Sequence, residues 1–358
     1  MNSEQSGRRV SREQEDTNRI KTREKLITNQ ETDEDLVLNL SLRPAKLKDF
    51  VGQGGVVENL KISIEATRKR NEPLEHTLLS GPPGLGKTSL AHIIAREMGS
   101  KITATSGPAI ERAGDLIGIL TNLAPGDILF IDEIHRLSKV VEEFLYPAME
   151  NFQIDFVIDK GPYAKTIKFN LKRFTLIGAT TRAGLLTAPL RGRFGLFYHL
   201  DFYEPEELVK IILRSAKIFN ITIEKDAAIE ISGRSRGSPR VANRLLRRVR
   251  DWAEVKSDGK VTHDAVIDAL KSHGVDSFGL DSIDRKVIAV IHESFGGGPA
   301  GVEAIAATLN EQSDTIADVV EPYLLKMGFL RRTPRGRELT SKAYSALGLK
   351  REVQKEMF

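Results

Sequence analysis

The chain has 358 residues, a formal net charge of +4, 40% hydrophobic and 28% charged residues, which is typical of a globular protein of two or three domains. It has no cysteine, which excludes disulfide bonds, thiolate metal sites and a cysteine nucleophile, and suits a reducing cytoplasm. Because no apolar run reaches the ~18 residues of a membrane span and the charged N-terminus lacks a signal core, we expect a cytoplasmic protein without membrane contact.

The charge is unevenly distributed along the chain. Residues 1–38 hold nine acidic and seven basic side chains with few apolar ones, which predicts a disordered leader. Residues 234–250 hold seven arginines and no acid, and residues 322–358 hold nine Lys or Arg against three Glu. This basic density indicates a polyanionic partner, although a solvated charged face is the ordinary alternative.

The stretch TLLSGPPGLGKTSLAHIIAREMG, 77–99, reads as a short apolar strand, a glycine turn and an amphipathic helix. Its turn has the spacing G-x-x-x-x-G-K-T, with Gly81, Gly86, Lys87 and Thr88. Such a turn lets backbone N–H groups surround phosphates, while the lysine contacts the β/γ-phosphate oxygens and the threonine hydroxyl suits Mg²⁺. The sequence therefore predicts ATP and Mg²⁺ as cofactors.

Two later strands end in polar residues. DILFIDEIHRL, 127–137, ends in Asp132, suited to hold Mg²⁺ through water, and Glu133, suited to polarise the attacking water. An acidic helix cap is the alternative for this pair alone. FTLIGATTRAGLL, 174–186, ends in two threonines, and Thr181 there can orient water or sense the γ-phosphate.

An arginine pair follows in PLRGRFG, 189–195, more than a hundred residues after the phosphate loop. Either Arg191 or Arg193 could touch a nucleotide, and the residues alone do not decide between them.

The rest of the chain divides into three predicted domains after the leader. Residues 39–203 alternate strands and helices, which predicts a parallel sheet covered by helices; residues 204–275 are helical. Residues 276–358 read as three helices and a β-hairpin, at 283–294, 302–309, 315–327 and 328–340. That order is typical of a winged helix, whose hairpin arginines suit DNA phosphates.

Further runs of the sequence are more specific than the general ATPase motifs. They are LRPAKLKDFVGQ (42–53), TSGPAIERAGDL (105–116), EEFLYPAME (142–150), SRGSPRVANRLLRRVRD (235–251), FGGGPAGVE (295–303) and EPYLLKMGFLRRTPRGR (321–337). Together with the motifs above, over residues 39–350, the chain resembles the RuvB family of AAA+ ATPases. The resemblance implies an α/β AAA+ P-loop domain, a small helical lid domain and a C-terminal winged-helix domain.

RuvB proteins are bacterial motors that drive branch migration of Holliday junctions as hexameric rings, with each ATP between two protomers. By this resemblance Arg193 is the arginine finger of a neighbouring site, Arg240 is the sensor-2 arginine, and Thr88 and Asp132 serve the metal. The remaining nucleotide contacts carried over are Leu42, Arg43, Gly84, Gly86, Lys87, Ser89, Glu150, Phe152 and Tyr203.

The resemblance also implies partners. Arg332 and Arg337 match residues that contact double-stranded DNA, and Arg335 joins them by proximity; Ser313 stands where many members have a further basic residue. The segment 151–173, with alternating apolar residues around Lys-Gly-Pro, is expected to be a β-hairpin that docks on the RuvA tetramer. Its exposed apolar members would be Phe156, Ile158 and Tyr163. The RuvC resolvase belongs to the wider complex.

Three alternatives remain at this point. The hairpin could fold back on its own domain instead of binding a partner. The chain could be another DNA-associated AAA+ ATPase, such as a clamp-loader subunit, although that class is expected to end in a helical collar. It could also be a winged-helix regulator switched by ATP, which would need neither Glu133 nor a finger acting in trans.

Overall fold

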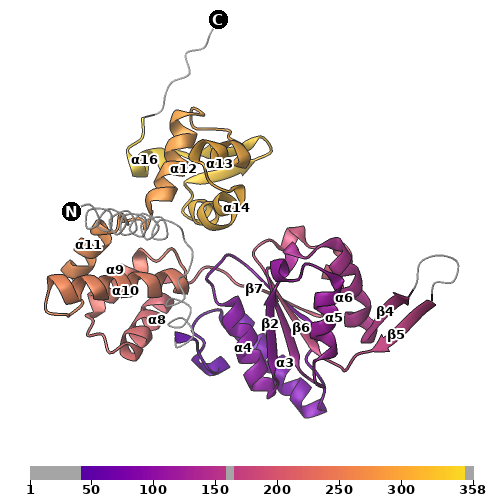
Figure 1. Ribbon diagram of the computed structural model, residues 1–358. Coiled ribbons are helices and arrows are strands. Elements are labelled where there is room, and N and C mark those ends of the chain that lie inside the picture. The colour runs from indigo at the N-terminus through magenta and orange to yellow at the C-terminus, as the bar shows by residue number, and fades with distance from the viewer. Residues whose placement is uncertain (1–41, 159–164, 351–358) are drawn as a thin grey trace, which may run out of the picture. The chain divides into compact units, whose positions relative to one another are not determined.

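The computed structural model of the protein describes residues 42–158 and 165–350, with side chains described outside 156–167 (Figure 1). The expected leader, 1–38, lies outside the described residues. The chain divides between Arg43 and Pro44 into two units, and the fold below is that of the second. Within the described part, no helix is long and apolar enough to cross a membrane.

A parallel sheet of five strands, in the order β2-β3-β6-β1-β7, forms the centre of the first domain. The strands are β1 (Thr77–Ser80), β2 (Ile102–Ser106), β3 (Ile128–Asp132), β6 (Thr175–Thr180) and β7 (Leu196–His199). All carboxyl ends meet at one edge of the sheet because the strands are parallel. The predicted parallel α/β sheet is confirmed.

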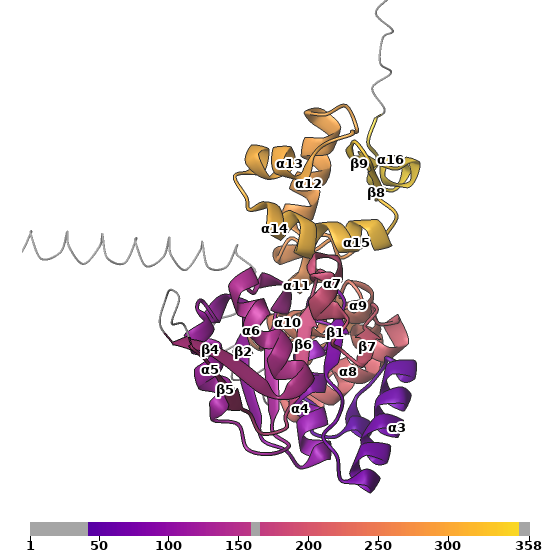
Figure 2. The same ribbon diagram turned by 90° about the vertical axis from the view of Figure 1, so that its right-hand side faces the viewer.

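Helices cover both faces of the sheet because successive strand residues point to opposite sides. Leu79 packs in the cluster that contains helices α3 (Gly54–Arg70) and α4 (Lys87–Met98), while Leu78 packs in the one that contains α5 (Ala113–Thr121) and α6 (Lys139–Asn151) (Figure 2). Short helical turns complete this domain: η1 (Leu47–Asp49), η2 (Gly107–Ala109), η3 (Ile134–Arg136), η4 (Ala183–Leu185) and α7 (Ala188–Arg191).

A separate antiparallel hairpin leaves the sheet between α6 and β6. Its strands, β4 (Gln153–Ile158) and β5 (Lys165–Asn170), pair in a continuous register and run away from the sheet (Figures 1 and 2). The expected hairpin in 151–173 is therefore present. Tyr163, and the side chains of Phe156 and Ile158, lie outside what the structure describes.

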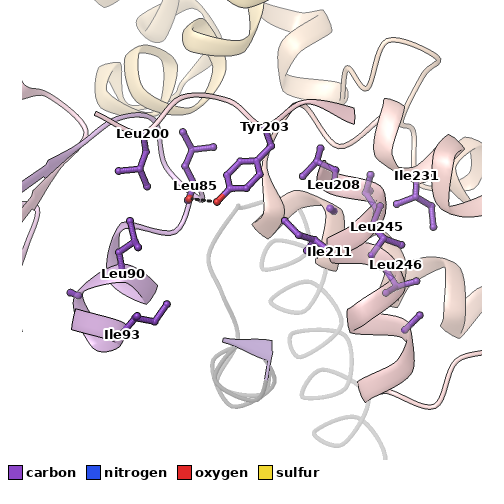
Figure 3. Close-up of a cluster of buried hydrophobic side chains, with 14 of the residues drawn as sticks. Leu85, Leu90, Ile93, Leu200, Tyr203, Leu208, Ile211, Ile231, Leu245 and Leu246 are labelled. Atoms are coloured by element: carbon purple, nitrogen blue, oxygen red, sulfur yellow. Dashed lines mark hydrogen bonds between the residues drawn. The ribbon is translucent and has the colours of Figure 1, made fainter. Parts of the chain in front are cut away.

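Four helices build the second domain: α8 (Pro205–Ile218), α9 (Lys225–Gly233), α10 (Pro239–Lys256) and α11 (His263–Ser272). The first begins where the sequence favours a start, since Pro205 is its first residue and Glu204 and Glu207 on either side form a capping box. Leu208, Leu245 and other apolar side chains of these helices join the same buried cluster as Leu90 of α4 (Figure 3).

The C-terminal domain has its own core and is a winged helix, as predicted. Its helices are α12 (Ser282–Glu293), α13 (Val302–Leu309), α14 (Ser313–Thr315), which continues through a π-helical turn (Ile316–Val320) into α15 (Glu321–Lys326), and α16 (Ser341–Leu347). The wing consists of β8 (Leu330–Thr333) and β9 (Gly336–Leu339). Ile305, Leu324 and Phe329 are fully buried between these elements.

Candidate active site

The phosphate loop connects the carboxyl end of β1 to the first turn of α4. Gly81 and Gly84 have φ angles of 133° and 79°, and a Cβ atom would lie 2.3 Å from the Leu200 carbonyl oxygen at the first and 2.6 Å from Ser238 Oγ at the second. Helix α4 begins without a side-chain cap, so its first N–H groups point into the loop. These groups, with the positive end of the helix dipole, suit a phosphate.

Lys87 is buried beneath this loop. Its Nζ donates hydrogen bonds to the carbonyl oxygens of Gly81 at 2.7 Å and Pro82 at 2.9 Å. Burial lowers the pKa of Lys87 to about 8, although the nearby carboxylates of Glu133 and Asp132 act in the opposite direction. The ammonium group is thus held at the loop in a poorly hydrated position where phosphate oxygens would favour its charged form.

Thr88 and Asp132 meet at the carboxyl edge of the sheet, as the parallel strands require. The Thr88 hydroxyl donates to Asp132 Oδ2 at 3.3 Å, and Asp132 Oδ1 accepts from the N–H of Glu133 at 3.0 Å. Mg²⁺ in phosphate-transfer sites is held by one or two oxygen ligands together with substrate phosphates. The hydroxyl and carboxylate beside the phosphate loop fit that requirement.

Glu133 lies next to Thr181 at the tip of β6. Its Oε2 accepts hydrogen bonds from the Thr181 backbone N–H at 3.2 Å and from the Thr181 hydroxyl at 3.1 Å. Burial favours a higher pKa for Glu133, but hydrogen bonds from His135 and Thr181 and the charge of Lys87 outweigh it and lower the pKa. The carboxylate is therefore ionised at neutral pH, as a general base must be.

His135 is a further member of this cluster that the motif reading did not single out. Its Nδ1 lies 3.2 Å from Glu133 Oε2 and 2.9 Å from the Thr180 hydroxyl, and its side chain is only 7% exposed. In the sequence, His135 lies two residues after Glu133 in the segment DILFIDEIHRL.

The helical domain and the residue just before it, Tyr203, also contact the phosphate loop. The Tyr203 hydroxyl donates to the Leu85 carbonyl oxygen at 3.1 Å, as Figure 3 shows, and the Ser238 hydroxyl donates to the Gly84 carbonyl oxygen at 3.2 Å. The backbone N–H of Arg240 is 3.4 Å from the same oxygen. Two residues expected at the nucleotide, Tyr203 and Arg240, are thus brought to the loop, whereas the contact of Ser238 was not foreseen.

Arg193 lies at the opposite edge of the sheet. Two residues beyond it, the Gly195 N–H donates to the His76 carbonyl oxygen at 3.0 Å, which places this segment beside the amino end of β1, while the phosphate loop follows its carboxyl end. The Arg193 guanidinium is 2.9 Å from Glu150 Oε1 and stacks 4.5 Å from the centre of the Tyr146 ring. Arg193 is therefore not brought to the phosphate loop of its own chain.

The other arginine of the pair differs in its contacts. The Arg191 guanidinium lies 5.9 Å from the centre of the Phe197 ring, which is 48% exposed. Its contact is thus a cation–π pair with a surface side chain.

Glu150 and Phe152, two of the expected nucleotide residues, are also away from their own phosphate loop. Glu150 pairs with Arg193, and Phe152 packs against the rings of His76 and Phe174, which precede β1 and β6. All three aromatic residues thus belong to the amino edge of the sheet.

For three of the residues expected at the nucleotide, burial and position in the chain are the relevant observations. Ser89 is half-buried in the first turn of α4. Leu42 is buried and Arg43 half-buried at the end of the first unit of the chain, so a place at the nucleotide remains a prediction for both.

The expected DNA residues lie in the wing, where two of them share one carboxylate. Arg332 and Arg337 each form two hydrogen bonds with Glu321, at 2.7 to 3.0 Å. Arg335 is exposed at the turn between the strands. Glu321 begins the segment EPYLLKMGFLRRTPRGR, but sequence spacing does not reveal its ion pairs because its partners lie 11 and 16 residues away.

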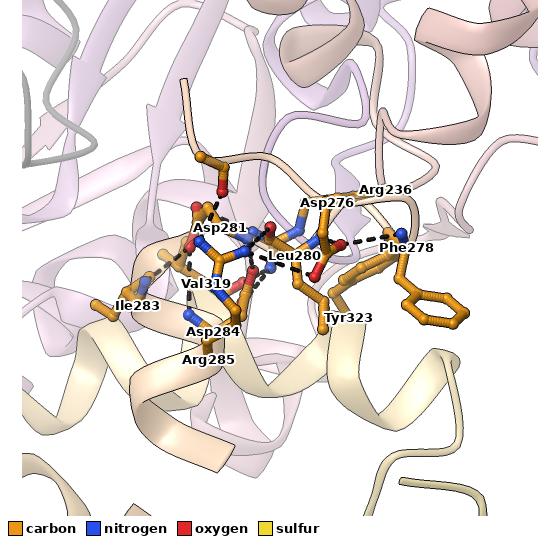
Figure 4. A network of polar contacts seen from close by, with 11 residues as sticks. Arg236, Asp276, Phe278, Leu280, Asp281, Ile283, Asp284, Arg285, Val319 and Tyr323 are labelled. Carbon is orange, nitrogen blue, oxygen red and sulfur yellow. Dashed lines mark hydrogen bonds and ion pairs between the residues drawn. The ribbon is translucent and has the colours of Figure 1, made fainter. Parts of the chain in front are cut away.

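Two ion-paired arginines that sequence reasoning missed connect the domains. Arg182, next to Thr181, pairs with Asp318 and Asp314 of the C-terminal domain. Arg236, from the segment before α10, is 2.9 Å from Asp284 and stacks 4.7 Å from the centre of the Tyr323 ring (Figure 4). Burial raises the pKa of Asp284, while the charge of Arg236 opposes that shift.

Comparison with known families covers nearly the whole described chain. Residues 42–200 match the family model for the Holliday junction DNA helicase RuvB P-loop domain, residues 203–276 the RuvB AAA lid domain, and residues 277–348 the RuvB C-terminal winged helix domain. The chain belongs to the RuvB family. It is thus a P-loop AAA+ ATPase, and a RuvB winged helix stands where a clamp loader would have a collar.

Individual RuvB proteins are similar over most of their length. The Holliday junction branch migration complex subunit RuvB of Desulfosudis oleivorans is 55% identical over 324 residues, which are 90% of this chain and 94% of the relative. The structure of the Thermotoga maritima RuvB Holliday junction branch migration motor matches with a TM-score of 0.80 at 49% identity, covering 87% of this chain and 99% of that one. A mutant of the Thermotoga RuvB matches with a TM-score of 0.81 at 50% identity, over 86% and 99%.

The pKa of Lys87 predicts how nucleotide binding by this RuvB-family protein depends on pH. Because bound phosphates stabilise the ammonium form, the pKa of Lys87 rises from about 8 when ATP binds. ATP binding should therefore take up a proton above about pH 8, and affinity should fall up to tenfold per pH unit until the pKa of the complex is reached.

Calorimetric titration with ATP at about pH 8.5, in two buffers of different ionisation enthalpy, measures this proton uptake. Lys87→Arg is the matched control, because a guanidinium stays protonated at this pH. Equal uptake by both proteins would assign the proton to another group.

Proposed function

We propose that this protein is the ATP-driven motor that moves Holliday junctions by branch migration, in recombination and DNA repair. The observation that carries the proposal is the match of all three of its domains, in order, to those of RuvB. An ATP site joined to a winged helix suits a protein that converts hydrolysis into movement along DNA. We divide it into domains at 39–203, 204–275 and 276–358.

In this proposal the carboxyl edge of the sheet performs hydrolysis. The phosphate loop, with Gly84, Gly86, Lys87 and Ser89, would bind ATP, and Thr88 and Asp132 would hold Mg²⁺. When bound, Mg²⁺ offsets the negative charge of the phosphates. Glu133 accepts the proton of the attacking water. Thr181 donates two hydrogen bonds to Oε2 of Glu133 and thereby orients this carboxylate toward the water.

The proposal includes a ring of six subunits on duplex DNA. Arg193 lies beside the amino end of β1 and the phosphate loop follows its carboxyl end, which supports a finger that acts on the site of a neighbour. Glu150 and Phe152 would accompany Arg193 at that interface, while Leu42, Arg43, Tyr203 and Arg240 would complete the nucleotide site within the subunit.

Movement would arise between the first two domains. Arg240 lies in α10 of the helical domain and Lys87 in α4 of the P-loop domain, and both adjoin the same loop. A γ-phosphate contacted by both would hold the domains at one angle, and its loss on hydrolysis would release that angle.

The partners follow the same proposal. Arg332, Arg337 and Arg335 of the wing would contact phosphates of double-stranded DNA, which carry no sequence information and suit a motor that moves on any sequence. The 151–173 hairpin would dock on RuvA, and the exposed apolar side chain of Phe169 near the base of the hairpin, 44% exposed, supports such a contact. The complex would act in the cytoplasm and include RuvC.

Glu133→Gln should bind ATP with nearly unchanged affinity and hydrolyse it about 10²–10⁴-fold more slowly, because the amide cannot accept the proton of water. Fluorescent-nucleotide binding and steady-state phosphate release measure the two effects. Turnover near that of the unmodified protein would remove Glu133 from its assigned role.

Mixing subunits tests whether Arg193 acts in trans. Arg193→Ala alone should lose on the order of 10³–10⁵-fold in turnover, and Lys87→Ala alone should fail to bind ATP. Their mixture should regain hydrolysis, greatest at equal proportions, because an intact phosphate loop then meets an intact finger.

The matched control mixes Lys87→Ala with Glu133→Gln. Both changes damage the same half of the site, so no mixing ratio should restore activity. Rescue in this control, or none in the Arg193→Ala mixture, would contradict the arrangement.

The decisive experiment for the function is movement of a synthetic four-way junction. The protein should convert it to duplex products with ATP, more efficiently with RuvA, whereas Lys87→Ala should not. DNA binding that responds to ATP without any junction movement would instead favour the ATP-switched regulator.

A further inference from the structure

Glu321 is a buried carboxylate that pairs with two arginines of the wing and has no role in the proposed function. It begins α15, and its side chain is 1% exposed. Arg332 of β8 and Arg337 of β9 lie directly opposite each other across the hairpin. Like charges at directly opposed positions repel, so this pair needs a counter-ion to remain side by side.

The contacts of Glu321 are symmetrical between the two arginines. Oε1 accepts from the Nε of Arg332 at 2.7 Å and of Arg337 at 3.0 Å, and Oε2 accepts from the Nη2 of each at 3.0 Å. One carboxylate thus holds two guanidinium groups, each in a bidentate fork. Such forks fix the plane as well as the position of a guanidinium.

This geometry leaves the opposite edges of both groups for another ligand. A guanidinium has five N–H bonds, and the forks engage the side formed by Nε and Nη2, so each Nη1 is directed away from Glu321. The side chains of Arg332 and Arg337 remain 58% and 20% exposed. Two positive groups around one negative group leave a net positive charge, which attracts backbone phosphates.

We propose that Glu321 is a positioning residue for DNA binding, whose buried carboxylate holds Arg332 and Arg337 with their outer N–H edges set for backbone phosphates. The inference rests on the proposed DNA contact of the wing. Its benefit is entropic, because two long side chains are ordered before DNA arrives and lose little further freedom on binding. Charge alone gives the opposite expectation, since removal of an acidic group from a DNA-binding surface strengthens attraction to phosphate.

Glu321→Gln in the full chain separates the two accounts. With the forks weakened, affinity for duplex DNA should fall about tenfold even though the protein gains a positive charge. Fluorescence anisotropy with an arbitrary duplex over a series of salt concentrations measures it. The dependence of log affinity on log salt should keep its slope, because the same phosphates are still contacted.

Glu338→Gln is the matched control on the same wing. Glu338 pairs with Arg331 across the hairpin, so this change also removes one negative charge. Its affinity should equal or exceed that of the unmodified protein. Glu321→Gln binding as tightly as Glu338→Gln would overturn the positioning role.

A double variant distinguishes the two ways in which the proposal could fail. Arg332→Ala with Arg337→Ala should weaken binding and reduce the salt slope by about 2, one for each lost phosphate contact. If this double variant binds normally, the wing contact itself is wrong, and the role of Glu321 falls with it. If it binds weakly while Glu321→Gln does not, only the positioning role is overturned.

If circular dichroism shows that Glu321→Gln does not fold, Glu321→Asp decides. It keeps the charge but shortens the reach, so it should bind DNA more weakly than the unmodified protein with an unchanged salt slope. Unmodified affinity in Glu321→Asp would overturn the proposal.

Discussion

Parallel pairing of β1, β3 and β6 is the constraint on which the catalytic geometry depends. Because these three strands run in one direction, the phosphate loop, the Asp132–Glu133 pair and Thr181 leave the sheet at one edge. The hydrogen bonds from Thr181 to Glu133 join strand ends that are 48 residues apart in the chain. No single loop could hold these groups in place, whereas a buried sheet fixes them to its own register.

The same constraint explains why the site extends to a second domain. Gly81 and Gly84 of the loop have positive φ and no side chain, so neighbouring groups approach the backbone closely at these two positions. Ser238 of the helical domain and Tyr203, at the junction to that domain, reach its carbonyl oxygens. Close packing by residues of another domain makes the conformation of the loop sensitive to the angle between the two.

The sequence predicted those features that follow from local rules. The parallel sheet, the hairpin, the winged helix and the polar strand tips at Asp132 and Thr181 follow from periodicity and from the common direction of the strands. It did not predict His135, Ser238 or Glu321, because their roles depend on contacts with distant segments. A pattern shows which residues lie on an edge or a face, but the pairing of two charged groups depends on side-chain geometry that spacing alone does not contain.

The backbone hydrogen bond between Gly195 and His76 has a mechanical consequence. It attaches the segment that carries Arg193 to the beginning of β1, and the end of the same strand leads into the phosphate loop. The four residues of β1 span about 13 Å, and because the strand is buried within a sheet it is rigid. In the proposed ring, the two ends of β1 in each subunit would therefore lie near two consecutive ATP sites. A displacement at one site would then be transmitted to the next through this strand, without involving DNA.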